Sequence, residues 1–143
     1  MNVVQCLIEK VQKEQNIAYM FDLHGHSAKK NIFAFGDESM IGTLPYLQSR
    51  IIPKILSDII STFKYKSCLF KRSKDKKNTA RVYLSQKYKI NIITFEESYG
   101  LIDEGPIGIR HWKNFGTAIA DALLQYSEIC RNGDPEKMGE YLS

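Results

Sequence analysis

A nearly continuous apolar run, residues 17–23, is the feature that most constrains how this chain can fold. It contains one polar residue, Asp22, and it follows a segment, 3–11, whose apolar residues recur at helical spacing. A run of this kind is typical of a strand that is covered on both faces of its sheet. The helix-then-strand order therefore predicts an α/β fold with helices flanking the sheet.

Three further segments have the composition of strands. They are residues 32–35, 81–84 and 90–95. The helical predictions follow from caps and apolar spacing. A helix is predicted to begin at Thr43 and Pro45, because a hydroxyl caps free amides and proline suits the first turn. We expect Pro53 to break or kink it.

The C-terminal third of the chain is predicted to be a loop followed by a helix. Residues 99–114 contain three of the nine glycines and are read as a loop. Apolar residues at helical spacing predict a final helix over 115–129, and Asn132-Gly133 is expected to end it.

The composition indicates one globular domain of 143 residues, with 43% hydrophobic and 25% charged residues. Its three cysteines are widely spaced, so we expect reduced thiols rather than a disulfide framework. The absence of a signal-like or membrane-spanning run predicts a soluble, cytoplasmic protein with no membrane partner. A net charge of +4 is too low to favour a nucleic-acid partner.

The segment 64–77 carries seven cations and one acid, Asp75. Such a run is typical of a solvated loop, but it also attracts an acidic substrate. Both interpretations stay open on the sequence alone.

The stretch that follows the first predicted strand holds two of the three histidines. Because side chains alternate along a strand, Asp22, His24 and His26 share one face. Imidazole and carboxylate together suggest a metal, although such a group is also often only a hydrogen-bonded structural pair. A complete site from these three residues is disfavoured, since their backbones lie about 6 to 7 Å apart along the strand.

The last predicted strand ends in two acids, Glu96 and Glu97, which point to opposite faces. Apolar residues on both faces leave open which of them enters a site. With His24 and Arg81, either one suggests a hydrolytic zinc site, in which a carboxylate accepts the proton of a metal-bound water.

Four segments carry a resemblance to a known family. They are Phe21-Asp22-Leu23-His24-Gly25-His26-Ser27, Lys29-Lys30-Asn31-Ile32-Phe33, Lys77-Asn78-Thr79-Ala80-Arg81-Val82 and Asn91-Ile92-Ile93-Thr94-Phe95-Glu96. Over residues 5–130 the chain resembles the cytosolic carboxypeptidases of the zinc carboxypeptidase superfamily, which include the tubulin deglutamylases. The resemblance implies a mixed β-sheet flanked by helices.

The resemblance also implies roles for individual residues. His24 matches the third zinc ligand, and Glu96 matches the general base. Arg81 matches the position that lines the pocket for the C-terminal side chain, where it would pair with the carboxylate of a terminal glutamate. His26 is implied to be a substrate-binding residue of the cleft, and Glu97 a structural or surface acid.

The implied activity is that of a zinc metallocarboxypeptidase that removes C-terminal glutamates from acidic protein tails, such as those of polyglutamylated tubulin. The family's first two zinc ligands lie in an H-x-x-E motif that this sequence lacks. The resemblance therefore implies that residues 1–143 are the C-terminal half of a catalytic domain. Two smaller departures are Ala28, in place of a frequent arginine, and Asn78-Thr79-Ala80, in place of a Gly-Thr-Gly.

The missing ligands have physical consequences. One imidazole cannot hold a catalytic zinc ion tightly. Half of a sheet exposes an edge, so we expect the chain to be poorly soluble or to self-associate. The alternative functions are a non-catalytic module that binds acidic tails and an inactive truncated product.

Overall fold

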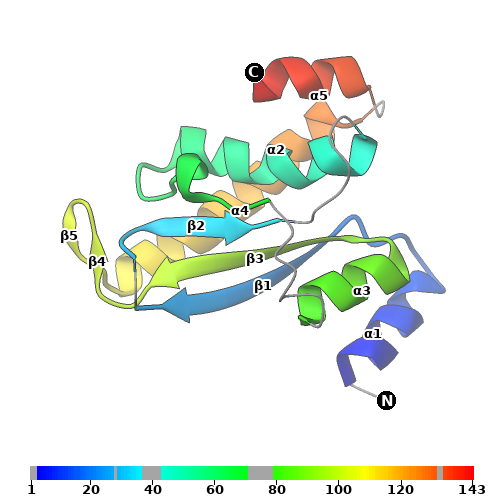
Figure 1. Cartoon of the computed structure of the whole chain (residues 1–143), viewed down its shortest axis with the longest axis horizontal. Coiled ribbons are helices and arrows are strands. Elements are labelled where there is room, and N and C mark those ends of the chain that lie inside the picture. Colours follow the sequence, from blue (N-terminus) through cyan, green and yellow to red (C-terminus); the bar gives the residue numbers. More distant parts are fainter. Residues whose placement is uncertain (1–2, 28, 37–42, 71–78, 132–133) are drawn as a thin grey trace.

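A computed structural model describes residues 3–27, 29–36, 43–70, 79–131 and 134–143. Its elements, drawn in Figure 1, are α1 (Val3–Gln12), β1 (Tyr19–His26), β2 (Ile32–Phe35), α2 (Leu44–Ile59), the short 3-10 helix η1 (Tyr65–Ser67), α3 (Ala80–Tyr88), β3 (Asn91–Ser98), β4 (Leu101–Ile102), β5 (Gly105–Pro106), α4 (Ile109–Ile129) and α5 (Pro135–Leu142).

The main sheet has the strand order β1-β3-β2. β1 runs parallel to β3, with His24 beside Glu96, and β2 runs antiparallel to β3, with Phe33 on the other side of Glu96. The sheet is therefore mixed. β4 and β5 form a separate two-stranded hairpin.

Helices cover both faces of this sheet (Figure 1). On one face, β3 supplies Ile93 and Phe95 to the main core, which also contains buried residues of α2, α4 and α5. Phe95 meets Phe115 of α4 edge-on, with ring centroids 5.2 Å apart. The predicted α/β fold with a mixed sheet flanked by helices is confirmed.

A smaller cluster covers part of the other face. Ile8 of α1 and Leu84 of α3 pack there with Ile90 and Ile92. Ile8 is the only buried residue of α1, so this helix is attached to the sheet by a small apolar contact. The predicted first helix and the strands at 32–35 and 90–95 are confirmed.

β1 differs from the strand predicted for this segment in one respect. The predicted run at 17–23 does contain a strand, but β1 lies at an edge of the sheet and has no fully buried residue. Leu23 is 62% exposed. The prediction of a strand covered on both faces was wrong, because periodicity reports the apolar character of a run and not its position in the sheet.

The prediction of a strand at 81–84 was also wrong, since these residues lie in α3. The hydroxyl of Thr79 accepts a bond from the Val82 amide and caps the helix. Lys89 ends the helix in the left-handed conformation, with φ of 58°. These capping residues outweigh the strand propensity of a few apolar side chains.

The remaining helices differ from their predictions at particular residues. α2 continues through Pro53, which is buried, rather than breaking there. α4 begins at Ile109, six residues earlier than predicted from 115. α5 was not predicted, although Asp134 caps it and Pro135 occupies its first turn. The predicted stop at Asn132-Gly133 lies outside the described residues.

Candidate functional site

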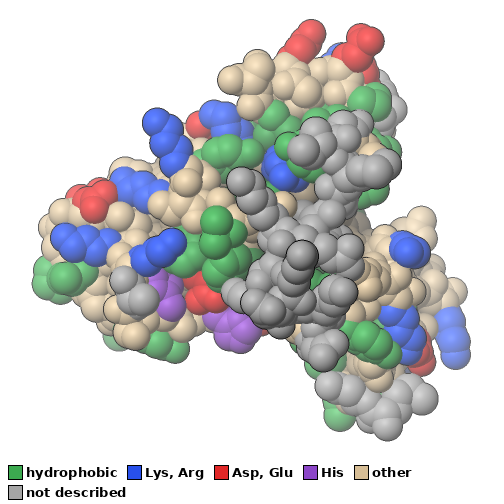
Figure 2. Space-filling model, in the orientation of Figure 1, with side chains coloured by type: hydrophobic (Ala, Val, Ile, Leu, Met, Phe, Trp, Pro, Cys, Tyr) green, Lys and Arg blue, Asp and Glu red, His purple; other side chains and the backbone are tan. Residues whose placement is uncertain are grey.

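One pocket brings together four of the residues singled out in the sequence: Asp22, His24, Arg81 and Glu96. It has a volume of about 210 Å³ and is lined by Asp22, His24, Phe35, Thr79, Ala80, Arg81, Thr94 and Glu96. The parallel pairing of β1 with β3 sets His24 beside Glu96, and the first turn of α3 adds Arg81. In Figure 2, histidine and acidic side chains meet at the lower edge of the molecule, below a group of lysine or arginine side chains.

His24 is held by its neighbour on the same strand face. Its Nδ1 lies 3.4 Å from Oδ2 of Asp22, and the Thr94 hydroxyl donates to the same oxygen over 3.3 Å. The His24 side chain is 59% exposed. A carboxylate at Nδ1 orients an imidazole so that Nε2 is the nitrogen available to a metal.

The two glutamates at the end of β3 have different environments. Glu96 is half-buried and lines the pocket. Glu97 points to the opposite face of the sheet and is 3% exposed, and its Oε2 has no hydrogen-bond partner among the described residues. Burial raises the pKa of Glu97 to about 7. Of the two acids, Glu96 is the one positioned for chemistry in this pocket.

Arg81 reaches the pocket from a helix rather than from the predicted strand. Arg81 is buried, and its Nη1 donates a hydrogen bond to the Gly36 carbonyl. A guanidinium has five N–H donors in a fixed plane, and the bond to Gly36 fixes the direction of that plane.

His26 lies outside this pocket. Its Nδ1 accepts a bond from the Lys29 amide over 3.1 Å, and its ring meets Phe33 edge-on at 5.0 Å. Its Nε2 is buried, with no hydrogen-bond partner among the described residues. In this arrangement His26 packs against β2 and does not line the space beside His24.

A larger cavity of about 450 Å³ adjoins the pocket and shares Asp22, His24, Ala80 and Arg81 with it. The cavity extends under α1 and α3, where its additional lining is mostly apolar: Val4, Gln5, Met20, Tyr83, Leu84 and Ile92. Sequence patterns do not predict this extension, because Val4 and Tyr83 belong to helices far apart in the chain.

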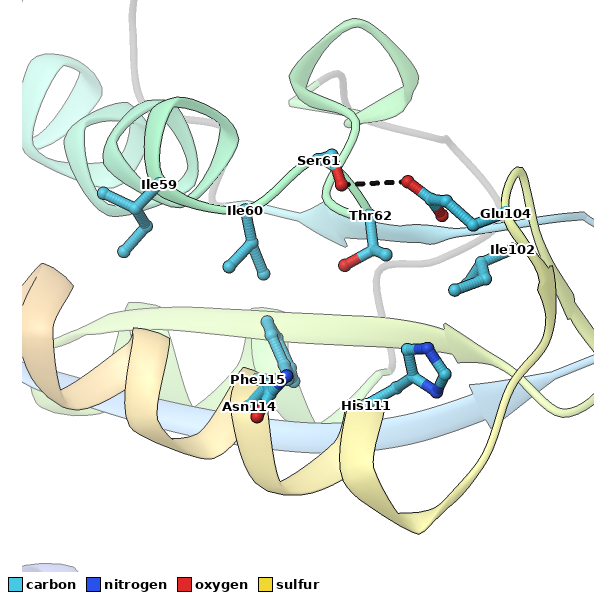
Figure 3. A pocket seen from close by; sticks show the side chains of 9 residues that line it. All are labelled: Ile59, Ile60, Ser61, Thr62, Ile102, Glu104, His111, Asn114 and Phe115. Atoms are coloured by element: carbon cyan, nitrogen blue, oxygen red, sulfur yellow. Dashed lines mark hydrogen bonds between the residues drawn. The ribbon is translucent and has the colours of Figure 1, made fainter.

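A further cavity of about 370 Å³ lies between the end of α2, β4 and the start of α4 (Figure 3). The Ser61 hydroxyl donates to Glu104 over 2.9 Å at its rim. The third histidine, His111, points into this cavity, and its Nδ1 accepts from the Gly108 amide. This cavity contains none of the residues predicted for the site.

The described part of the basic segment 64–77 does not reach the pocket lining. Lys64 pairs with Asp103 at 2.9 Å. Residues 71–77, which carry most of its cations, lie outside the described residues.

Comparisons with known proteins point to the same family as the sequence motifs. The chain is 28% identical to cytosolic carboxypeptidase 2 of Danio rerio over 92% of its length, and 31% identical to cytosolic carboxypeptidase 2 of Mus musculus over 85%. It is 32% identical to cytosolic carboxypeptidase 3 of Bos taurus over 85%. The chain belongs to the family of the cytosolic carboxypeptidases. It is thus related to a family of metallocarboxypeptidase enzymes.

The chain spans less than a fifth of the length of each of these three proteins: 19%, 15% and 13% respectively. Comparison with family models gave no match. A metallo-carboxypeptidase from Burkholderia cenocepacia has the same fold, with a TM-score of 0.69 at 16% identity over 87% of this chain and 35% of the other. None of the described helices combines the length and apolarity that a membrane crossing requires.

The family implies a metal, and the donors can be compared with what a metal needs. Within the described ranges, no group of three or more His, Cys, Asp or Glu side chains is arranged to hold an ion. His24, oriented by Asp22, fits a single ligand position.

Proposed function

We propose that this chain supplies one zinc ligand, the general base and the side-chain pocket of a carboxypeptidase that removes C-terminal glutamates from acidic protein tails. The observation that carries the proposal is the position of His24 beside Glu96 on paired strands, with Arg81 in the same pocket. In this proposal the other ligands come from polypeptide outside residues 1–143, and these residues correspond to the C-terminal half of a catalytic domain.

Each residue then has a defined task. Bound zinc supplies Lewis acidity toward water and the peptide carbonyl. Nε2 of His24 would hold the ion, and Asp22 would keep the imidazole oriented. The Glu96 carboxylate takes a proton from the attacking water and delivers it to the nitrogen of the departing glutamate.

Arg81 supports the choice of an acidic substrate. A guanidinium binds a carboxylate through two parallel N–H bonds, and water exclusion around a buried one strengthens the pairing. The cations of segment 64–77 would draw a glutamate-rich tail, such as that of polyglutamylated tubulin, toward the pocket.

Binding without cleavage is the second candidate function. Among the described residues that line this pocket, His24 is the one imidazole, and one imidazole alone is too weak to hold a catalytic ion. A chain acting by itself would therefore bind acidic tails through Arg81 and leave them intact.

The deciding experiment is to determine the 5′ end of the transcript and to express its longest open reading frame. We expect that protein to carry an in-frame H-x-x-E motif and to release glutamate from a peptide that ends in glutamates. Glu96→Gln should lower kcat by about 100-fold or more, whereas Glu104→Gln, an exposed acid outside the pocket, should not. Full activity of Glu96→Gln would refute the assignment of the base. If the longest protein binds the peptide through Arg81 but releases no glutamate from it, the result would favour the binding module.

A further inference from the structure

The Arg81 guanidinium is bonded to a backbone group at the end of β2. Nη1 of Arg81 donates to the carbonyl of Gly36, and both residues are buried. Gly36 directly follows β2, the strand that places Phe33 beside Glu96. Gly36 itself does not line the pocket of about 210 Å³. Its effect on a bound substrate would therefore pass through Arg81.

Two backbone hydrogen bonds join this end of β2 to the residues just before Phe70. The Leu69 amide donates to the Ala34 carbonyl over 2.9 Å, and the Gly36 amide donates to the Leu69 carbonyl over 3.1 Å. Phe35 and Leu69 thus form a parallel bridge. These bonds fix the position of Gly36 relative to Leu69 and Phe70.

The Phe70 ring lies directly against Gly36. A methyl group added at residue 36 would overlap atoms of this ring, so the ring occupies the space that a side chain would need. Backbone conformation does not explain the glycine, because among the described glycines the one with a positive φ is Gly105. The close approach of the ring is what favours glycine at this position.

Arg50 of α2 restrains the Phe70 ring. Its guanidinium carbon lies 4.4 Å from the ring centroid of Phe70 and 3.4 Å from that of Tyr46. Nη1 of Arg50 donates to the Tyr46 carbonyl over 2.9 Å, which holds the guanidinium against its own helix. A cation over an aromatic face is attracted to the ring. The Tyr65 ring also meets Phe70, with centroids 5.9 Å apart. Displacement of the Phe70 ring would break these contacts, so they oppose it.

We propose that Gly36 is a positioning residue that directs Arg81 toward the carboxylate of a terminal glutamate, and that Phe70 and Arg50 hold Gly36 in place. The contacts form a continuous path from α2 to the pocket. A guanidinium makes two parallel bonds to a carboxylate only when its plane faces that carboxylate. A displaced Gly36 carbonyl would therefore weaken binding of a glutamate end more than binding of other ends. This inference rests on the proposed function, in which Arg81 binds the terminal glutamate.

Calorimetric titration of the longest expressed protein tests the inference, with one peptide that ends in glutamate and one that ends in alanine. A zinc chelator keeps the peptides intact during the titration. Gly36→Ala should lower affinity for the glutamate end by about tenfold and change affinity for the alanine end little. The control is Gly116→Ala in α4, where the added methyl group meets no atom within 4 Å. It should bind both peptides like the wild type. An equal loss for both peptides in Gly36→Ala would overturn the inference.

A second variant reaches the Phe70 ring from α2. Arg50→Met keeps an unbranched side chain but removes the planar cation, so the preference for the glutamate end should fall by about threefold or more. Lys54→Met is the control on the same helix, since Lys54 pairs with Asp58. Circular dichroism shows whether each variant folds. If Gly36→Ala does not fold, Arg50→Met decides, and an unchanged preference in that variant would overturn the inference.

A double variant tests whether Gly36 acts through Arg81. Gly36→Ala combined with Arg81→Gln should bind both peptides like Arg81→Gln alone, whereas additive losses would show independent roles. The single Arg81→Gln variant separates this inference from the proposed function. If it loses the preference and a folded Gly36→Ala keeps it, the positioning role is wrong and the proposed function stands. If Arg81→Gln itself keeps the preference, the proposed role of Arg81 is wrong, and the positioning role is wrong with it.

Discussion

At the scale of single residues, the two adjacent glutamates of β3 show how one position along a strand changes the chemistry of a side chain. Glu96 lies at a pocket with His24, whereas Glu97 is buried on the opposite face. Burial favours the neutral acid, and Oε2 of Glu97 has no hydrogen-bond partner among the described residues. Burial thus raises the pKa of Glu97 to about 7.

Glu97 should make folding stability depend on pH. Because its folded-state pKa lies above the value of 4.5 for an exposed glutamate, its favourable contribution is complete below about pH 4.5 and is lost as the pH rises through about 7. Glu97→Gln should therefore be more stable than the wild type at pH 8, by about 2 to 3 kcal/mol, and similar to it at pH 4.5. Urea unfolding at the two pH values measures this. Equal stability of the two proteins at pH 8 would contradict it, and the exposed Glu104→Gln is the control.

Arg81 should discriminate between peptide ends. Arg81→Gln removes the cation from the pocket, so affinity for a peptide ending in glutamate should fall by about 10- to 100-fold, as expected for a hydrogen bond between charged groups. Affinity for a peptide ending in alanine should change little. Lys87→Gln is the control, because Lys87 is a cation of the same helix that pairs with Glu9 outside the pocket. Calorimetric titration of both peptides compares the two variants, and an equal loss for both peptides would refute the role.

At the scale of elements, α3 sets the position of Arg81, and the start of α3 depends on its cap. Thr79→Ala removes the acceptor for the Val82 amide and should destabilise the chain by about 1 kcal/mol. Thr117→Ala is a matched change inside α4, where the exposed hydroxyl bonds only to its own helix. Denaturant midpoints should fall for Thr79→Ala and hardly move for Thr117→Ala. If the Thr79 cap did not stabilise the chain, Thr79→Ala and Thr117→Ala would have equal denaturant midpoints.

Whether an element can be predicted depends on whether its signal is local in the sequence or comes from packing with distant residues. β2 and β3 were predicted because runs of aromatic and branched residues are local signals. α3 was missed because its identity depends on one capping hydroxyl and a left-handed lysine rather than on periodicity. The continuity of α2 through Pro53 depends on packing against the main core, which no local pattern contains.

The candidate site was predictable to a similar degree. His24, Arg81 and Glu96 were found through motifs, and the structure places them around one pocket. The apolar cavity beside them depends on α1 and α3 meeting over the sheet, so sequence spacing could not reveal it. The packing of His26 against Phe33 likewise depends on which strand lies next to β3.

At the scale of the whole molecule, the two faces of the sheet are buried unequally. The main core joins β3 with α2, α4 and α5, whereas α1 and α3 share a much smaller cluster. We expect backbone amides of α1 and α3 to exchange with deuterium faster than those of α2 and β3, because fewer buried apolar contacts resist local opening. Mass spectrometry of peptides from the four elements measures the rates. Similar protection of α1 and α2 would show that the chain opens only as one unit.

The pairing of β1 with β3 also has a consequence for the order in which the molecule assembles. It joins residues such as Asp22 and Thr94, which are 72 positions apart in the chain. Closing so long a loop costs entropy before any contact compensates for it, and parallel strands of this kind pair slowly. During synthesis the apolar β1 leaves the ribosome long before β3 exists. The nascent chain is therefore expected to depend on chaperones until β3 arrives, and the pocket at His24 forms only after that step.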